Sequence, residues 1–127
     1  MSHQYRDRIR ALERRAERAG ESLDPDPPAE DRAMELLREG LGPTVSLYCA
    51  ARTGDSWVRF GESEFERLEA TMNAWLELYA ACYGVDLDTT HNIREAAELL
   101  VDTHNIRDVA AVLTGVPERR GVSEKLT

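Results

Sequence analysis

Apolar side chains recur at intervals of three and four residues near the start of the chain. This spacing places them on one face of a helix. Gly20 follows the last of them, and glycine is common just after a helix ends. The pattern therefore predicts an amphipathic helix over residues 4–19. Its apolar stripe contains Tyr5, Ile9, Leu12, Ala16 and Ala19.

The next segment breaks this pattern, because residues 24–28 read Asp-Pro-Asp-Pro-Pro. Proline lacks a backbone N–H and restricts the residue before it. Residues 20–28 are therefore predicted to form a stiff linker. A second helix is predicted to start near residues 29–31 and to end within residues 40–43, which contain two glycines and a proline.

The longest apolar stripe covers residues 63–83 and predicts a central helix of about six turns. Its aromatic members are expected to lie in the core. The stripe consists of Phe65, Leu68, Met72, Trp75, Leu76, Tyr79, Cys82 and Tyr83. Two short helices are predicted beyond it, over residues 90–101 and 103–114. Residues 116–127 are charged and lack an apolar pattern, so a mobile tail is expected there.

Residues 44–60 fit two predictions. Apolar residues 45–49 and 57–60 flank Gly54-Asp55, which favours a β-hairpin. A helix from Pro43 to Arg52, closed by Gly54, is the alternative, because Ala50-Ala51-Arg52 suits a helix. We prefer the hairpin.

The elements together predict a mainly α fold, a helical domain with a long central helix, a small β-hairpin and a C-terminal helical pair. We divide the chain into a basic N-terminal helix (1–19), a Pro-rich linker (20–28), an acidic helical core domain (29–115) and a tail (116–127).

Charge changes this picture, because it is distributed unevenly. The chain carries 24 acidic and 16 basic residues, a net charge of −8, and all of the basic residues except Lys125 are arginines. Residues 1–19 hold six arginines and three acids, a net charge of +3, so residues 20–127 carry −11. A basic amphipathic helix can bind nucleic acid, a membrane surface, a partner helix or an acidic body.

This acidic, arginine-rich and nearly lysine-free composition resembles that of small acidic proteins from halophilic archaea. High salt screens the repulsion between acids, and arginine makes bidentate ion pairs. A GC-rich genome would produce the same preference for arginine. The resemblance implies a salt-adapted cytoplasm and supplies no functional residues. Two cysteines in apolar surroundings, without a secretory leader or a membrane span, also favour a reducing cytoplasm.

One motif occurs twice, as Thr-His-Asn-Ile-Arg at residues 90–94 and 103–107. Helix capping explains most of this repeat. Residues 94–107 also resemble a helix-turn-helix, in which His104, Asn105 and Arg107 would read DNA bases. The usual turn glycine is absent, however, and the net charge opposes binding to phosphates.

No catalytic, cofactor or metal signature stands out. His91 and His104 with Asp88 and Asp102 could in principle hold a metal, but zinc sites usually have tighter spacing. We therefore expect a non-enzymatic interaction or regulatory domain without a cofactor. Its partner would be a protein, or a second copy in a homodimer, and not a membrane. The residues expected to bind that partner are Tyr5, Ile9, Leu12, Arg10 and Arg14.

Two alternatives remain open at this stage. DNA binding through the C-terminal helical pair, near residues 90–114, is the first. The second is a ligand-binding or enzymatic pocket, which would gather Tyr79, Tyr83, His91 and His104.

Overall fold

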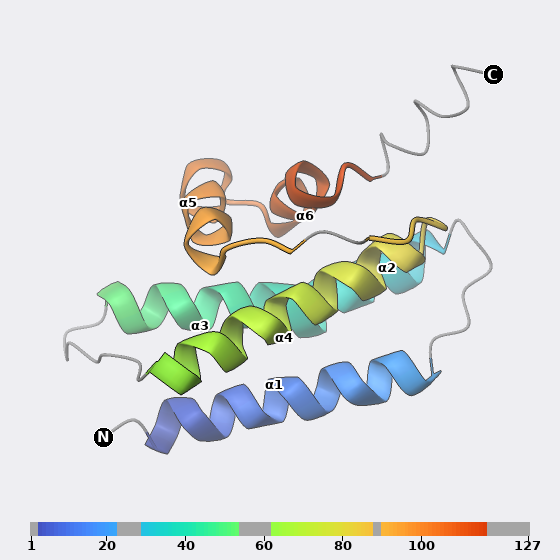
Figure 1. Cartoon of the computed structure of the whole chain (residues 1–127). Helices are drawn as coiled ribbons and strands as arrows, with labels where there is room; N and C mark the ends of the chain where they lie inside the picture. The colour runs from blue at the N-terminus through green and yellow to red at the C-terminus, as the bar shows by residue number, and fades with distance from the viewer. Residues whose placement is uncertain (1–2, 23–28, 54–61, 88–89, 117–127) are drawn as a thin grey trace.

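The chain folds into helices stacked in three layers (Figure 1). The computed structural model describes residues 3–22, 29–53, 62–87 and 90–116. Within these residues there is no strand, which confirms the mainly α class. The elements are α1 (His3–Ser22), α2 (Glu30–Leu36), the π-helical segment η1 (Leu37–Leu41), α3 (Gly42–Thr53), α4 (Glu62–Ala81), α5 (Ile93–Thr103) and α6 (Ile106–Thr114).

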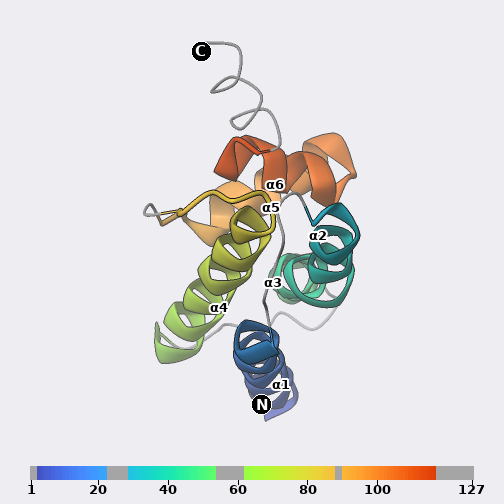
Figure 2. The ribbon, with the colours of Figure 1, turned by 90° about the vertical axis from the view of Figure 1, so that its right-hand side faces the viewer.

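The middle layer contains α4 and the helical run from α2 through η1 to α3, which lie side by side (Figure 2). Helix α1 covers one side of this layer and packs mainly on α4. Helices α5 and α6 cover the opposite side, where α5 packs on α3 and α6 contacts α4. The core therefore lies on both sides of the middle layer.

Helix α4 confirms the predicted long central helix, and its apolar stripe supplies the centre of the core. Trp75 and Tyr79 are the largest fully buried side chains of the described residues. Ile9 from α1 and Ile93 from α5 reach this core from the two outer layers. The predicted C-terminal helical pair is confirmed as α5 and α6, each starting about three residues later than expected.

The predicted β-hairpin is wrong for residues 45–49, which lie within α3. Val45, Leu47 and Tyr48 are all buried, because α3 is covered by α1, α4 and α5 on different sides. A helix buried on several faces carries a nearly continuous apolar run, and such a run is hard to distinguish from a strand. The alternative helix from Pro43 to Arg52 matches α3 closely. The expected turn and second strand fall within residues 54–61, outside the described part of the chain.

Two predicted helix ends are also wrong. Helix α1 passes through Gly20 and ends at Ser22. The second helix does not stop at residues 40–43 but passes through η1 into α3. The structure leaves residues 23–28 of the predicted linker undescribed. Val116, the first residue of the predicted tail, is fully buried, and the rest of that tail is not described.

Pro43 explains why the helix widens at this point. Proline has no N–H to donate and its ring crowds the carbonyl four residues earlier, which here belongs to Glu39. Just before Pro43, the N–H of Gly42 donates to the carbonyl of Leu37, five residues back, as in a π-helix. The helical run therefore continues past the proline with one wide turn and does not break.

The Glu39 carbonyl receives a donor from another helix. Arg15 on α1 donates from Nη1 to this oxygen over 2.7 Å. Because Pro43 cannot make the usual helical bond to Glu39, this contact satisfies an acceptor that the proline leaves open. Arg15 thus links α1 to the wide turn of η1.

Gly40 in η1 lies directly against the indole ring of Trp75. A Cβ atom built at Gly40 would overlap the ring carbons Cδ2, Cε2 and Cε3. Trp75 is only 1% exposed, and its ring would have to shift from its packed position to admit that atom. Position 40 therefore requires glycine because of packing.

We expect Gly40→Ala to lower the free energy of unfolding by about 1–3 kcal/mol, the usual cost of overpacking a core. Gly20→Ala provides the matched control, because a Cβ there would meet Leu78 Cδ2 at an ordinary 3.7 Å. That substitution should raise the stability by roughly 0.5–1 kcal/mol, since alanine is the better helix former. Urea unfolding followed by circular dichroism measures both. Equal effects of the two substitutions would contradict the packing argument.

Candidate functional site

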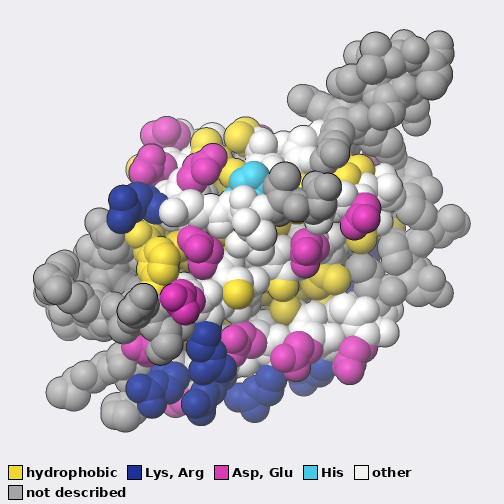
Figure 3. Space-filling view, viewed as in Figure 1, with side chains coloured by type: hydrophobic (Ala, Val, Ile, Leu, Met, Phe, Trp, Pro, Cys, Tyr) yellow, Lys and Arg dark blue, Asp and Glu magenta, His cyan; other side chains and the backbone are white. Residues whose placement is uncertain are grey.

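The arginines of α1 form the most prominent charged feature of the described surface. They lie along one edge of the molecule, over α1, with acidic side chains in a band beside them (Figure 3). All six are exposed, and they are Arg6, Arg8, Arg10, Arg14, Arg15 and Arg18. The predicted separation of charge therefore places a basic edge on an acidic body.

Ion pairs along the seam between α1 and α4 hold this basic edge in place. Arg67 on α4 donates to Glu13 on α1 through both Nε and Nη2, over 3.1 and 2.7 Å. This bidentate hydrogen bond, and the charge of Glu13, raise the pKa of the Arg67 guanidinium. Arg6 lies 3.9 Å from a carboxylate oxygen of Glu64. The seam therefore carries pairs of both orientations, beside the apolar contacts that pack α1 on the core.

Three other arginines form a row on the outward face of α1, at positions i, i+4 and i+8. We call Arg10, Arg14 and Arg18 the arginine row. The row has a short contact of its own, from Arg14 Nε to the carbonyl of Arg10 over 3.4 Å. Like charges four residues apart destabilise a helix by roughly 0.2–0.5 kcal/mol per pair. The packing of α1 does not require this row, because its buried face is apolar.

The predicted partner-binding residues divide between the two faces of α1. Ile9 and Leu12 are 1% and 6% exposed, because they pack inside the chain's own core. Arg10 and Arg14 are exposed. The side chain of Tyr5 lies outside the described part. The surface that α1 offers to another molecule is thus its basic face and not the apolar stripe.

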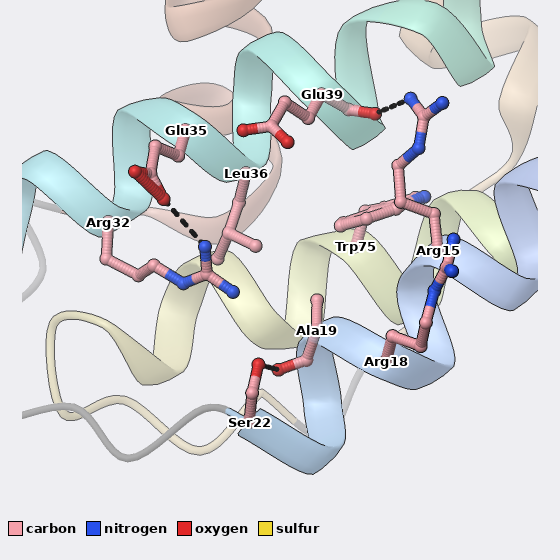
Figure 4. A pocket seen from close by; sticks show the side chains of 9 residues that line it. All are labelled: Arg15, Arg18, Ala19, Ser22, Arg32, Glu35, Leu36, Glu39 and Trp75. Carbon is pink, nitrogen blue, oxygen red and sulfur yellow. Dashed lines mark hydrogen bonds and ion pairs between the residues drawn. The ribbon is translucent and has the colours of Figure 1, made fainter.

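A hollow of about 310 Å³ opens between α1, the α2–η1 run and α4. Arg15 and Arg18 line one side and Arg32 lines the other, with Leu36 and Trp75 between them (Figure 4). The remaining lining residues are Ala19, Ser22, Glu35 and Glu39. Three guanidinium groups against two carboxylates give this hollow a net positive charge in a chain of net charge −8.

Some polar groups of this hollow have hydrogen-bond partners within the chain, and others do not. Arg32 Nη1 pairs with Glu35 Oε1 over 2.6 Å. Ser22 Oγ donates to the carbonyl of Ala19 over 3.3 Å. The indole Nε1–H of Trp75 is buried and has no hydrogen-bond partner among the described residues. A buried donor without a partner is uncommon, and a bound group or water is one way to satisfy it.

Sequence reasoning did not find the hollow. It assigned Trp75 to the core, which is correct for most of the ring, and it left Arg15 and Arg32 unassigned. The sequence contained one sign of a contact at this place, which is Pro43. A proline inside a helical run leaves the carbonyl of Glu39 without its usual donor, and a basic residue from a neighbouring helix can replace that donor.

A second hollow, of about 390 Å³, lies between α3 and α5. Its lining includes Tyr48, Cys49, Ala97 and Val101, and the last of these is 62% exposed. Burial raises the pKa of the Cys49 thiol, so the thiol is protonated near neutral pH. This environment is the opposite of the electropositive one that activates a nucleophilic cysteine. Neither Cys49 nor Cys82 forms a disulfide.

The repeated Thr-His-Asn-Ile-Arg motif caps helices in both of its copies. The Oδ1 atom of Asn92 accepts from the N–H of Arg94, at the start of α5. Asn105 does the same for Arg107 over 2.9 Å, at the start of α6. The capping residue in each copy is thus asparagine. One physical role accounts for the repeat.

The three predicted base-reading residues lie exposed where α5 turns into α6. His104 ends α5 in the left-handed conformation, with φ of 55°. Asn105 already uses its side-chain oxygen for the cap. Asp102 and Asp108 are exposed on either side of them, so Arg107 stands beside two acids.

The four residues of the predicted pocket are not brought together as a polar pocket. Tyr79 and Tyr83 are buried in the core, with ring centroids 5.4 Å apart. His104 is exposed at the end of α5. The backbone of His91 is held by Asn73, which accepts from its N–H over 2.8 Å and donates to its carbonyl over 3.1 Å.

Over the described part of the chain, no three His, Cys, Asp or Glu side chains are grouped so that they could hold a metal ion. Within the same residues, no helix combines the length and the apolar character needed to span a membrane.

A comparison with protein families places the chain. It matches, over residues 3–118, the family described as a domain of unknown function (DUF8055). The chain belongs to this family. Neither the curated proteins nor the solved structures contained a match. The DUF8055 match includes every helix from α1 to α6, so the basic helix is part of the domain that defines the family.

The buried tyrosines generate a prediction about alkaline pH. Burial is the main cause that raises the pKa of Tyr79 above its usual value of 10.0, and Tyr83 is raised for the same reason. Burial disfavours ionisation of these tyrosines in the folded state, so their contribution to the free energy of unfolding is fully present below about pH 10. Above that pH the unfolded chain loses these protons first, and the free energy of unfolding falls as the pH rises. Tyr79→Phe should reduce this fall, as measured by urea midpoints between pH 8 and 11. An unchanged pH dependence in the variant would refute the assignment to Tyr79.

Proposed function

We propose that this DUF8055 domain is a non-enzymatic interaction or regulatory domain whose arginine row binds an acidic protein surface. The observation that carries the proposal is the row itself. Arg10, Arg14 and Arg18 align on a face that packing does not use, so their guanidinium groups are open to another molecule. An acidic partner would gain ion pairs with all three.

The composition adds the proposed setting, the cytoplasm of a salt-adapted cell. In molar salt the Debye length is about 3 Å, so only charges in direct contact still attract each other. Arginine suits such contacts because its planar guanidinium binds a carboxylate through two hydrogen bonds. The Arg67–Glu13 pair is an example of this geometry within the chain.

A second copy of the chain is the first partner to consider. Residues 20–127 carry a net charge of −11, so each copy holds both a basic edge and an acidic body. A two-fold dimer that places the basic edge of each copy on the acidic surface of the other would pair these unlike charges twice.

We expect the double variant Arg10→Gln/Arg14→Gln to weaken this association roughly two- to thirtyfold, since exposed ion pairs contribute roughly 0.2–1 kcal/mol each. The control Arg94→Gln/Arg107→Gln removes the same charge from exposed positions on α5 and α6. Sedimentation velocity in 0.15 M and 2 M salt measures the association constants, and glutamine keeps the helices intact.

If the wild type is monomeric at both salt concentrations, a second measurement is needed. The wild type and both variants are then cross-linked in cells that produce them, and the proteins attached to each are compared. A partner whose binding depends on Arg10 and Arg14, but not on the control arginines, supports the proposal. If neither a second copy nor any partner shows that dependence, the proposal is refuted.

DNA binding through α5 and α6 remains the alternative, favoured by the exposure of His104, Asn105 and Arg107 together at one turn. Since Asn105 caps α6, its substitution would confuse a lost contact with a weakened helix. Arg107→Gln is the cleaner test, with Arg94→Gln as its control. Salt-dependent binding to duplex DNA that falls about tenfold or more in Arg107→Gln only, as a lost bidentate base contact would cause, would favour this alternative.

A further inference from the structure

We infer that the hollow lined by Arg15, Arg18, Arg32 and Trp75 is a binding site for the oxyanion group of a small ligand, a carboxylate or a phosphate. This function is separate from protein binding by the arginine row. The two share only Arg18, which stands at the end of the row and on the wall of the hollow.

The hollow is large enough for a small anion, and its walls carry guanidinium groups. A volume of about 310 Å³ is roughly ten times the share of one water molecule in the liquid, so a phosphate or a small organic acid fits. Guanidinium groups stand on opposite sides, from α1 and from α2 (Figure 4). Arginine presents a planar fork of donors that matches carboxylate and phosphate oxygens.

The arginines of the hollow have N–H groups that no residue of the described chain uses. Each arginine has five N–H groups. Arg15 uses Nη1 for the Glu39 carbonyl, and Arg32 uses Nη1 for Glu35. These two bonds fix the positions of the guanidinium groups and leave further N–H groups available. Arg18 has no hydrogen bond or ion pair to the described residues, so its charge is uncompensated there.

Trp75 is the third, independent observation. Its ring and Leu36 form an apolar wall of the same hollow. Its indole N–H is buried without a partner among the described residues, so the signal of this group reports on changes beside the hollow. The site therefore combines positive charge and an apolar surface, which together favour an oxyanion carried on a small organic group over a bare inorganic ion.

The widened helix contributes to the site. The π-helical turn η1 begins directly after Leu36 and contains Glu39, two residues of the hollow's wall. Such turns occur often at functional sites, because they displace backbone and side chains from the regular helix. Here the turn presents the Glu39 carbonyl to Arg15, which positions that guanidinium at the edge of the hollow.

The test is a titration of the full chain with inorganic phosphate at constant ionic strength, followed by the indole ¹H–¹⁵N signal of Trp75. Trp57→Phe identifies which of the two indole signals belongs to Trp75. We expect a saturable shift of that signal with a dissociation constant on the order of millimolar, typical of a small ligand held by a few charged contacts. Sodium chloride over the same range of ionic strength should produce no saturable shift.

Variants separate the site from a general ionic effect. Arg32→Gln and Arg18→Gln should each weaken phosphate binding roughly tenfold, because each removes a charge-assisted contact. Arg38→Gln is the matched control, an exposed arginine on the same helical run that does not line the hollow. Circular dichroism confirms that each variant is folded. Because Arg32 lies on α2, its effect is independent of the arginine row, and either proposal can fail while the other stands.

A second arm distinguishes the sources of the oxyanion. A triglutamate peptide that shifts the same signal, competes with phosphate and binds more tightly than phosphate would assign the hollow to a protein surface and overturn the small-ligand inference. Binding of phosphate alone identifies a free small molecule. The inference is refuted if neither probe produces a saturable shift, or if Arg38→Gln weakens binding as much as Arg32→Gln does.

Discussion

The contact between the Trp75 indole and the backbone of Gly40 determines how closely the two parts of the middle layer approach. With no side chain at position 40, α4 can lie against η1, and the indole fills the space between them. Helix α1 contacts both α4 and η1, so it docks only where those two elements are already close together. The hollow beside Trp75 exists for the same reason, since its walls come from these three elements.

Pro43 acts through the backbone, and its effect reaches α1. A missing N–H at position 43 favours a wide turn, and that turn leaves the Glu39 carbonyl to be satisfied by Arg15. Arg15 therefore has a structural role that its charge alone does not reveal. Among the other arginines of α1, Arg6 pairs with Glu64 on α4, whereas those of the row face outward. One basic helix thus places its arginines in different structural settings.

The elements that could be predicted were those with a single apolar face. Helices α1 and α4 each bury one stripe, so the three-and-four spacing located them to within a few residues. Helix α3 is covered on several sides, and its apolar run lost the periodicity that would have identified it. Gly40 and Pro43 were taken as signs of a helix end because local propensity favours one. Packing on Trp75 and a π-helical turn overrode that preference, and neither is visible in a local pattern.

The site was less predictable than the fold. Sequence reasoning found the basic helix and named Arg10 and Arg14 among its binding residues, but it also named Ile9 and Leu12, which pack in the chain's own core. The hollow depends on arginines from α1 and α2 that are far apart in the sequence, and no spacing rule joins Arg15 to Arg32. Asn92 and Asn105 show the opposite case, because a capping role follows from a few adjacent residues and the repeated motif displayed it twice.

The docking of α1 on α4 has a consequence for biosynthesis. Arg67 follows its partner Glu13 by 54 residues. At ribosomal rates of 5–20 residues per second, α1 waits roughly 3–10 seconds for the helix that covers it. Most of the stability of a helix in a protein comes from packing of its apolar face, and the apolar stripe of α1 lacks that packing meanwhile. Until α4 emerges, only the arginine-rich faces of α1 are suited to water, and its apolar stripe lacks the surface that covers it in the folded chain.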